Sequence, residues 1–177
     1  MTPEIIGTVA IQSPAGRFLS AVQQRVRAGF LIGRPLSRSN YAVVSTAPDR
    51  ITVRAADWLT AVNIGLNDIE LRLSTPGSVH YRVRFWRWAQ YVIGLSGVLG
   101  LAGVILLLTL DVRTYIAEHG ESRLPGLSVD QNVTVVWVIV LFFGLVWPWI
   151  LIAWHKRPLR KVITRIIHEV DAQAGSA

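Results

Sequence analysis

Two apolar stretches in the second half of the chain constrain its fold more than any other feature. They cover residues 89–110 and 133–154, and neither contains Asp, Glu, Lys, Arg or His. Each is as long as the roughly 20 apolar residues that span a hydrocarbon core of about 30 Å. A helix satisfies its own backbone hydrogen bonds in lipid, whereas a long buried helix of a soluble protein normally keeps a polar stripe. The sequence therefore predicts a hairpin of two transmembrane helices.

Charged residues are unevenly distributed around these stretches. The net charge is +7, and positive charge gathers in residues 1–88 and 155–177, while the connecting segment 111–132 is net negative. Lysine and arginine are enriched in the cytoplasmic loops of membrane proteins. We therefore expect a protein of the plasma (inner) membrane with both termini in the cytoplasm. Topology accounts for the basic residues, so we expect no nucleic-acid partner.

The chain also lacks features that define several other classes of protein. It has no cysteine, which excludes disulfides, iron–sulfur clusters and thiol nucleophiles. Residues 1–7 contain neither a basic segment nor a continuous apolar run, so they do not predict a cleavable signal peptide. Arginine outnumbers lysine sixteen to two, a usage that we interpret as a sign of a bacterial source.

Residues 1–88 predict a cytoplasmic α+β domain in which one helix covers a mostly antiparallel sheet. Alternating apolar and polar residues predict the strands. Ser13 before Pro14 is typical of a helix start, and Gly29 suits the helix end. The expected elements are a strand at 4–12, a helix at 14–27, a short strand at 30–32, and hairpins at 41–46 with 50–56 and at 69–74 with 79–85.

The segment 57–68 between the hairpins is more apolar than a solvated connection needs to be. It contains Trp58, Leu59, Val62 and Leu66. Three alternatives are open: a short helix or turn that fills the core, a loop that dips into the membrane, and the rim of a cavity for an apolar ligand.

Aromatic and basic residues gather at the expected cytoplasmic ends of the two stretches. Tryptophan and tyrosine are enriched where membrane helices meet lipid headgroups, and arginine and lysine reach the headgroups from there. Pro148 should also kink the second helix. The predicted membrane-interface residues are Arg84, Trp86, Arg87, Trp88, Tyr91, Trp147, Trp149, Trp154, Lys156 and Arg157.

Small residues recur along the first stretch. They allow helix backbones to approach closely, and packing drives the association of helices in lipid. The partner is the second stretch of the same chain, a second copy, or another membrane protein. The predicted packing residues are Gly94, Ser96, Gly97, Gly100 and Gly103.

The tail 155–177 predicts a basic amphipathic helix that opens at Pro158. Its apolar face has three alternatives: packing on the amino-terminal domain, lying on anionic lipid, and pairing with another chain. The residues of that face are Leu159, Val162, Ile163, Ile166, Ile167 and Val170.

The sequence contains no pattern that predicts catalysis, a cofactor or a metal site. The four histidines are His80, His119, His155 and His168. None has a partner at a spacing typical of metal ligands. Asp68 and Glu70 lie two apart on a predicted strand, where solvated carboxylates are common. We therefore expect a protein that is not an enzyme.

These observations favour a non-enzymatic membrane protein that binds other chains. Our first hypothesis is an accessory subunit of a membrane complex, with its cytoplasmic domain held at the bilayer. The alternative is a membrane-anchored receptor for a lipid or another small hydrophobic ligand. A transport component ranks behind both hypotheses, because the two stretches carry no charge that could line a conducting path.

Overall fold

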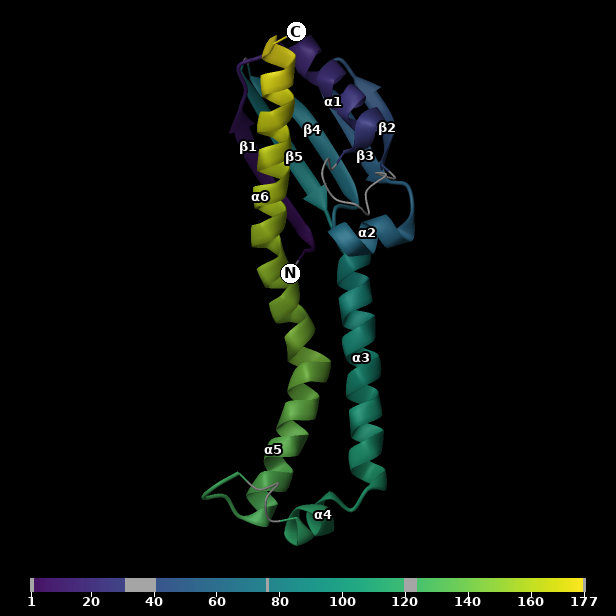
Figure 1. The fold of residues 1–177 in the computed structure, drawn as a ribbon, viewed down its shortest axis with the longest axis vertical. Coiled ribbons are helices and arrows are strands. Elements are labelled where there is room, and N and C mark those ends of the chain that lie inside the picture. The colour runs from purple at the N-terminus through teal and green to yellow at the C-terminus, as the bar shows by residue number, and fades with distance from the viewer. Residues whose placement is uncertain (1, 31–40, 76, 120–123, 177) are drawn as a thin grey trace. The chain divides into compact units, whose positions relative to one another are not determined.

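The computed structural model describes residues 2–30, 41–75, 77–119 and 124–176 of the chain, which divides into two compact units (Figure 1). The first unit comprises Met1–Gln90 together with Trp154–Ala177, and the second comprises Tyr91–Ala153. The first unit thus combines segments from before and after both apolar stretches. Most of the short strand predicted at 30–32 lies outside the described residues.

A five-stranded antiparallel sheet forms the centre of the first unit, with the strand order β1-β5-β4-β3-β2. Its strands are β1 (Glu4–Ala10), β2 (Tyr41–Ala47), β3 (Arg50–Ala55), β4 (Asp68–Thr75) and β5 (Ser78–Arg84). The two hairpins predicted from alternation are β2–β3 and β4–β5. The mixed α+β class expected from the sequence therefore fits this unit.

One face of the sheet forms the core. In a row across four strands, Ile5 pairs with Val83, Val83 with Ile69, and Ile69 with Val53, and all four side chains are buried. Successive side chains of a strand point to opposite faces, so the charged residues between them lie on the other face. Burying the apolar row is what fixes the register of these strands.

Helix α1 (Ala15–Gly29) covers part of this core and contacts β2 and β3. Phe18, Leu19, Val22 and Val26 recur at helical spacing, and all four are buried. The helix ends at Gly29, whose φ of 116° is a conformation that residues with a side chain rarely adopt.

The last part of helix α6 (Trp147–Ser176) is a second helical segment of the first unit. The sequence predicted a single covering helix, and the difference arises because the tail buries its own apolar face within this unit. In Figure 1 the yellow end of α6 runs over the β1 and β5 side of the sheet. The buried residues of this segment are Leu159, Ile163, Ile166, Ile167, Val170 and Ala174.

Helix α2 (Trp58–Ile64) occupies the apolar segment between the hairpins. Asp57 caps its start by accepting a hydrogen bond from the backbone N–H of Thr60 at 2.6 Å. Gly65 ends it in a left-handed conformation, with φ of 76°. The segment is thus a short helix that fills the core with one face only, because Ala61 is buried while Trp58 and Leu59 are exposed.

The second unit consists of helices. It contains α3 (Trp86–Thr109) from Tyr91 onward, α4 (Val112–Glu118), α5 (Val129–Leu141), the π-helical segment η2 (Phe142–Val146) and the first residues of α6. The segments α5, η2 and α6 follow one another without a break.

Two local predictions about helix starts are wrong. Pro158 lies inside α6 and does not open a helix; it supplies no backbone N–H, so α6 continues with one hydrogen bond fewer. Ser13 does not cap α1, whose first turn receives no side-chain cap. Its hydroxyl instead donates to Asp171, a residue 158 positions later in the chain.

Candidate membrane interface

Two helical segments are long and apolar enough to cross a membrane. They are α3, with a mean hydropathy of 2.4, and the continuous segment Val129–Ser176, with a mean hydropathy of 2.6 in its most apolar window. Only 6% of the residues in the first window and 17% in the second are buried within the protein. A helix that is apolar and exposed on most sides is costly in water and suited to lipid.

Within the second unit, the two segments meet closely at one pair of glycines. A Cβ atom built on Gly100 would lie 2.7 Å from the Cα atom of Gly144, and one built on Gly103 would lie 2.8 Å from Val140. By contrast, a Cβ atom on Gly94 or Gly97 would meet nothing within 4 Å. Of the predicted small residues, Gly100 and Gly103 therefore serve packing within the chain, and Gly94 and Gly97 face open space.

The π-helical segment η2 contains Gly144 at its centre. The backbone N–H of Trp147 bonds the carbonyl of Phe142, five residues earlier. The next residue, Pro148, has no N–H to donate to Gly144, and widening the preceding turn is a common way to accommodate such a gap. The sequence signalled an irregularity at Pro148, but a kink and a π-helical turn could not be distinguished from composition.

Several predicted interface residues of the first unit are exposed. The Trp86 side chain is 39% exposed, and the Arg87 guanidinium lies 5.4 Å from its ring centroid. Trp154 is 62% exposed, and Arg84 and Arg157 are exposed as well. A tryptophan ring with a guanidinium over its face suits the boundary between apolar lipid and charged headgroups.

The remaining interface residues differ in exposure. Tyr91 and Trp149 of the second unit are exposed, while Trp147 and Lys156 are partly buried.

Trp88 was predicted to belong to the interface, and the structure places it against His155 within the first unit. The two rings stack with centroids 3.8 Å apart and an interplanar angle of 8°. Phe85 meets the same imidazole edge-on, with centroids 5.6 Å apart. Burial lowers the pKa of His155 to about 4, and its buried Nε2 has no hydrogen-bond partner among the described residues. This cluster joins the start of α3 to α6.

Asn67 is a central residue of this region that the sequence analysis did not single out. Its side chain is 1% exposed; Nδ2 donates to the carbonyl of Ala61 at 2.9 Å, and Oδ1 accepts from the backbone N–H of Arg87 at 2.8 Å. Its backbone also bonds Ala55 and Arg84. One residue therefore links α2 and the first turn of α3 through its side chain, and two strands through its backbone. The available signal was a polar side chain beside the apolar residues of the segment 57–68.

The tail of α6 is anchored to the start of α1 by charged groups. Asp171 accepts hydrogen bonds from the backbone N–H groups of Gln12 and Ser13, each at 2.9 Å, and from the Ser13 hydroxyl at 2.6 Å. Burial raises the pKa of Asp171, but these bonds outweigh that effect and lower it below its ordinary value. The Arg25 side chain is 6% exposed and pairs with Glu169 at 2.5 Å.

The tail face predicted to meet the domain, lipid or another chain is thus occupied within its own unit. Ile163, Ile167 and Val170 of this face are at most 1% exposed, while Val162 at its edge is partly buried. The face is no open surface for lipid or a partner in this structure.

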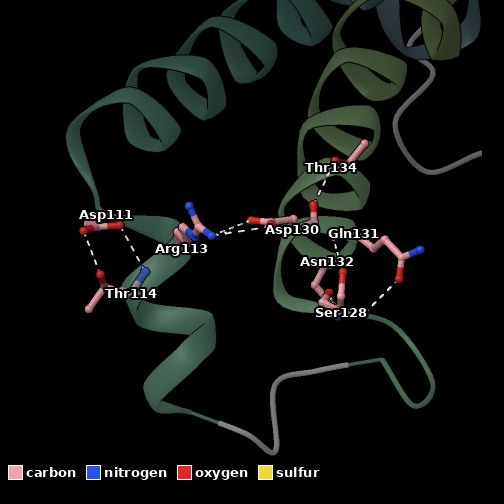
Figure 2. Close-up of polar contacts among 8 residues, drawn as sticks. All are labelled: Asp111, Arg113, Thr114, Ser128, Asp130, Gln131, Asn132 and Thr134. Carbon is pink, nitrogen blue, oxygen red and sulfur yellow. Dashed lines mark hydrogen bonds and ion pairs between the residues drawn. The ribbon is translucent and has the colours of Figure 1, made fainter.

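Where α4 precedes α5 in the second unit, side chains bond the exposed helix termini (Figure 2). Asp111 accepts hydrogen bonds from the backbone N–H and the hydroxyl of Thr114, at 3.0 and 2.7 Å. The Thr114 backbone bond is the largest cause of a lowered pKa at Asp111. Arg113 of α4 pairs with Asp130 of α5 at 3.2 Å.

The start of α5 is stabilised in the same way. Ser128 and Gln131 form a reciprocal capping box. Asn132 is 3% exposed, and its amide accepts from the backbone N–H of Leu124 and donates to the carbonyl of Ser128, both at 2.9 Å. These bonds tie the segment before α5 to the first turn of that helix.

The described residues contain no group of three or more His, Asp or Glu that could hold a metal ion. His80 contacts Thr8, and His119 stacks on Tyr115. His168 is exposed on α6.

The two carboxylates considered for acid–base chemistry both pair with arginines on the open face of the sheet. Asp68 lies 2.6 Å from Arg54, and Glu70 lies 3.5 Å from Arg50. Paired, solvated carboxylates of this kind are a poor basis for proton transfer in a catalytic site.

The space between α1 and the sheet, where an apolar ligand could bind, is filled by side chains. Phe18 and Val22 of α1 are at most 1% exposed there. An open depression of about 310 Å³ lies at the edge of α1 and β2, and its lining includes the polar residues Gln23, Arg27 and Thr46. A second depression of about 470 Å³ lies beside Ile11, Pro14 and Leu73, and both depressions are open to solvent and do not enclose a ligand.

Comparison with known proteins adds no relative. No protein-family model, no curated protein and no solved structure matches this chain. The functional argument therefore rests on the residues and contacts described above.

Proposed function

We propose that this chain is an integral membrane protein that holds an α+β domain at the cytoplasmic face of the plasma (inner) membrane and binds other membrane proteins as an accessory subunit. The observation that carries this proposal is the exposure of its two apolar helical segments, of which 6% and 17% are buried within the protein. Such segments need lipid or another protein to cover them.

The composition of the first unit supports a hairpin topology. Residues before the first apolar stretch and after the second belong to one compact unit, which supports a topology with both on the same side of the membrane. The chain then crosses the bilayer twice between Gln90 and Trp154. The basic residues at both ends favour the cytoplasm as that side.

A binding role is favoured over the alternatives by the surface of α3. Gly94 and Gly97 face open space, whereas Gly100 and Gly103 are used within the chain. Small exposed residues on a membrane helix allow another helix to approach. The filled space between α1 and the sheet gives less support to the ligand-receptor hypothesis.

Membrane insertion is tested by alkaline carbonate extraction and by labelling single cysteines, because the chain has none of its own. In intact inner-membrane vesicles of right-side-out orientation, Leu127→Cys should react with an impermeant maleimide, and Gln24→Cys should react only after permeabilisation. Extraction of the protein by carbonate, or reaction of Gln24→Cys from outside, would refute the proposed topology.

Partner binding is tested by affinity purification in mild detergent followed by mass spectrometry. Gly97→Leu should remove stoichiometric partner chains while the protein keeps its own fold. Gly103→Leu is the matched control, because it disturbs packing within the chain. A homo-oligomer that carries only bound lipid would contradict the accessory-subunit role and favour the receptor hypothesis.

A further inference from the structure

Helix α2 has one face in the core and an apolar face in solvent. Ala61 is fully buried and Val62 is 9% exposed, whereas Trp58 is 55% exposed and Leu59 is 63% exposed. Packing against the core therefore explains the apolar residues on one side of this helix, but not those on the other. Neighbouring tryptophan and leucine side chains on the surface are costly in water and typical of interaction surfaces.

The position of α2 relative to the start of α3 is fixed by Asn67. The buried amide bonds the carbonyl of Ala61 in α2 and the backbone N–H of Arg87 in α3, at 2.9 and 2.8 Å. Both bonds lie within the first unit, and the single side chain of Asn67 bridges α2 and the first turn of α3.

The start of α3 is itself at the expected height of the headgroups. The helix has 24 residues and is thus about 36 Å long, a few ångströms more than a hydrocarbon core of about 30 Å. Its first residues, the exposed Trp86 with Arg87 over its ring, have the composition of an interfacial end.

From this arrangement we propose that α2 lies in the interfacial layer of the same leaflet in which α3 begins, with Trp58 and Leu59 inserted among the lipid headgroups and upper acyl chains. The inference rests on the proposed function, because it requires α3 to cross the bilayer. Interfacial helices bury their apolar face about 5–10 Å into this boundary. The exposed arginines Arg84 and Arg157 of the same unit favour anionic lipid as the occupant of the surface.

Insertion of α2 would give the first unit an additional attachment to the membrane. A domain attached only through α3 and α6 is free to tilt about its two attachment points, whereas insertion of α2 adds a third point of contact with the membrane. The first unit then sits on the bilayer in one orientation, and the polar face of its sheet stays in water.

The test uses spin-labelled single cysteines in the full chain, reconstituted into vesicles of phosphatidylcholine with a minority of phosphatidylglycerol. Collision rates with membrane-soluble oxygen and water-soluble nickel chelate report the surroundings of each label. Leu59→Cys probes α2, and Val44→Cys is the matched control, because it is a 51% exposed apolar residue of the same unit on β2. Leu99→Cys, 63% exposed on α3, reports the spanning segment.

We expect the ratio of oxygen to nickel accessibility to be several-fold higher at residue 59 than at residue 44, and highest at residue 99. Equal ratios at residues 59 and 44, with a lipid-exposed label at residue 99, would overturn the α2 proposal and leave the proposed function intact. A water-exposed label at residue 99 would overturn both. Protection of residue 59 from both reagents would show that protein covers α2, and this result also overturns the proposal.

Thermal unfolding of each labelled variant verifies that the fold is retained. Both Leu59 and Val44 are more than half exposed, so their replacement by cysteine should leave the unfolding midpoint unchanged.

Discussion

Replacing Asn67 by alanine should destabilise the first unit more than any single surface change. The substitution removes two hydrogen bonds made by a side chain that is 1% exposed. It also leaves the backbone N–H of Arg87, in the first turn of α3, without its acceptor. First-turn N–H groups have no partner within their own helix, so nothing else in α3 can replace the amide.

The magnitude follows from which groups lose their partner. The Ala61 carbonyl still accepts from the backbone N–H of Gly65 at 3.1 Å, so only the Arg87 donor is orphaned. A buried hydrogen bond contributes about 0.5–1.5 kcal/mol net, and an orphaned buried group costs about 1–3 kcal/mol. We therefore expect Asn67→Ala to lower the free energy of unfolding by about 2–4 kcal/mol.

Hydrogen–deuterium exchange of the purified protein in detergent measures this effect locally. Peptides covering α2 and the first turn of α3 should exchange faster in Asn67→Ala, while peptides from the second unit should be unchanged. Asn132→Ala is the matched control: it removes a 3% exposed amide that bonds backbone groups only within the second unit. A loss below about 1 kcal/mol, or equal acceleration in both variants, would refute the proposed role of Asn67.

Three further changes have defined outcomes. Gly65→Ala should cost more than about 2 kcal/mol in urea unfolding, because φ is +76° and a Cβ atom would overlap Nε2 of His155. Gly100→Ala should weaken packing of the hairpin and lower its thermal midpoint in detergent, while Gly97→Ala should leave it unchanged. Burial lowers the pKa of His155 from 6.5 to about 4, so stability should be full above pH 6.5 and should fall as the pH drops from 6.5 to about 4. His155→Phe should lose that dependence in unfolding titrations.

The elements that the sequence predicted correctly are those with strong local patterns. Alternation over β4 and β5 and the Thr75–Ser78 turn between them predicted that hairpin, because a half-buried strand must place every second side chain in the core. The spacing of Phe18, Val22 and Val26 predicted α1, because a helix that covers a core must place every third or fourth side chain on its buried face.

The parts that escaped prediction depend on contacts between distant segments. A basic amphipathic helix suits a protein core, a lipid surface or another chain equally well, so the placement of the α6 tail required the structure. The Ser13 hydroxyl has the pattern of a helix cap, but a carboxylate from residue 171 competes successfully for it. Asn67 resembles an ordinary turn residue until its four bonding partners are known.

The order of segments along the chain has a consequence for how this protein is made. Synthesis produces the sheet and α1 first, but the apolar face of α6, with Ile163 and Ile167 at most 1% exposed, follows both apolar stretches. In the proposed topology, the part of the core that α6 covers therefore stays exposed in the nascent domain until the hairpin has been inserted. If the second apolar stretch failed to cross the membrane, α6 would remain on the opposite side from the sheet. The incomplete domain would then be open to proteases, so only chains with a correctly inserted hairpin would complete the domain.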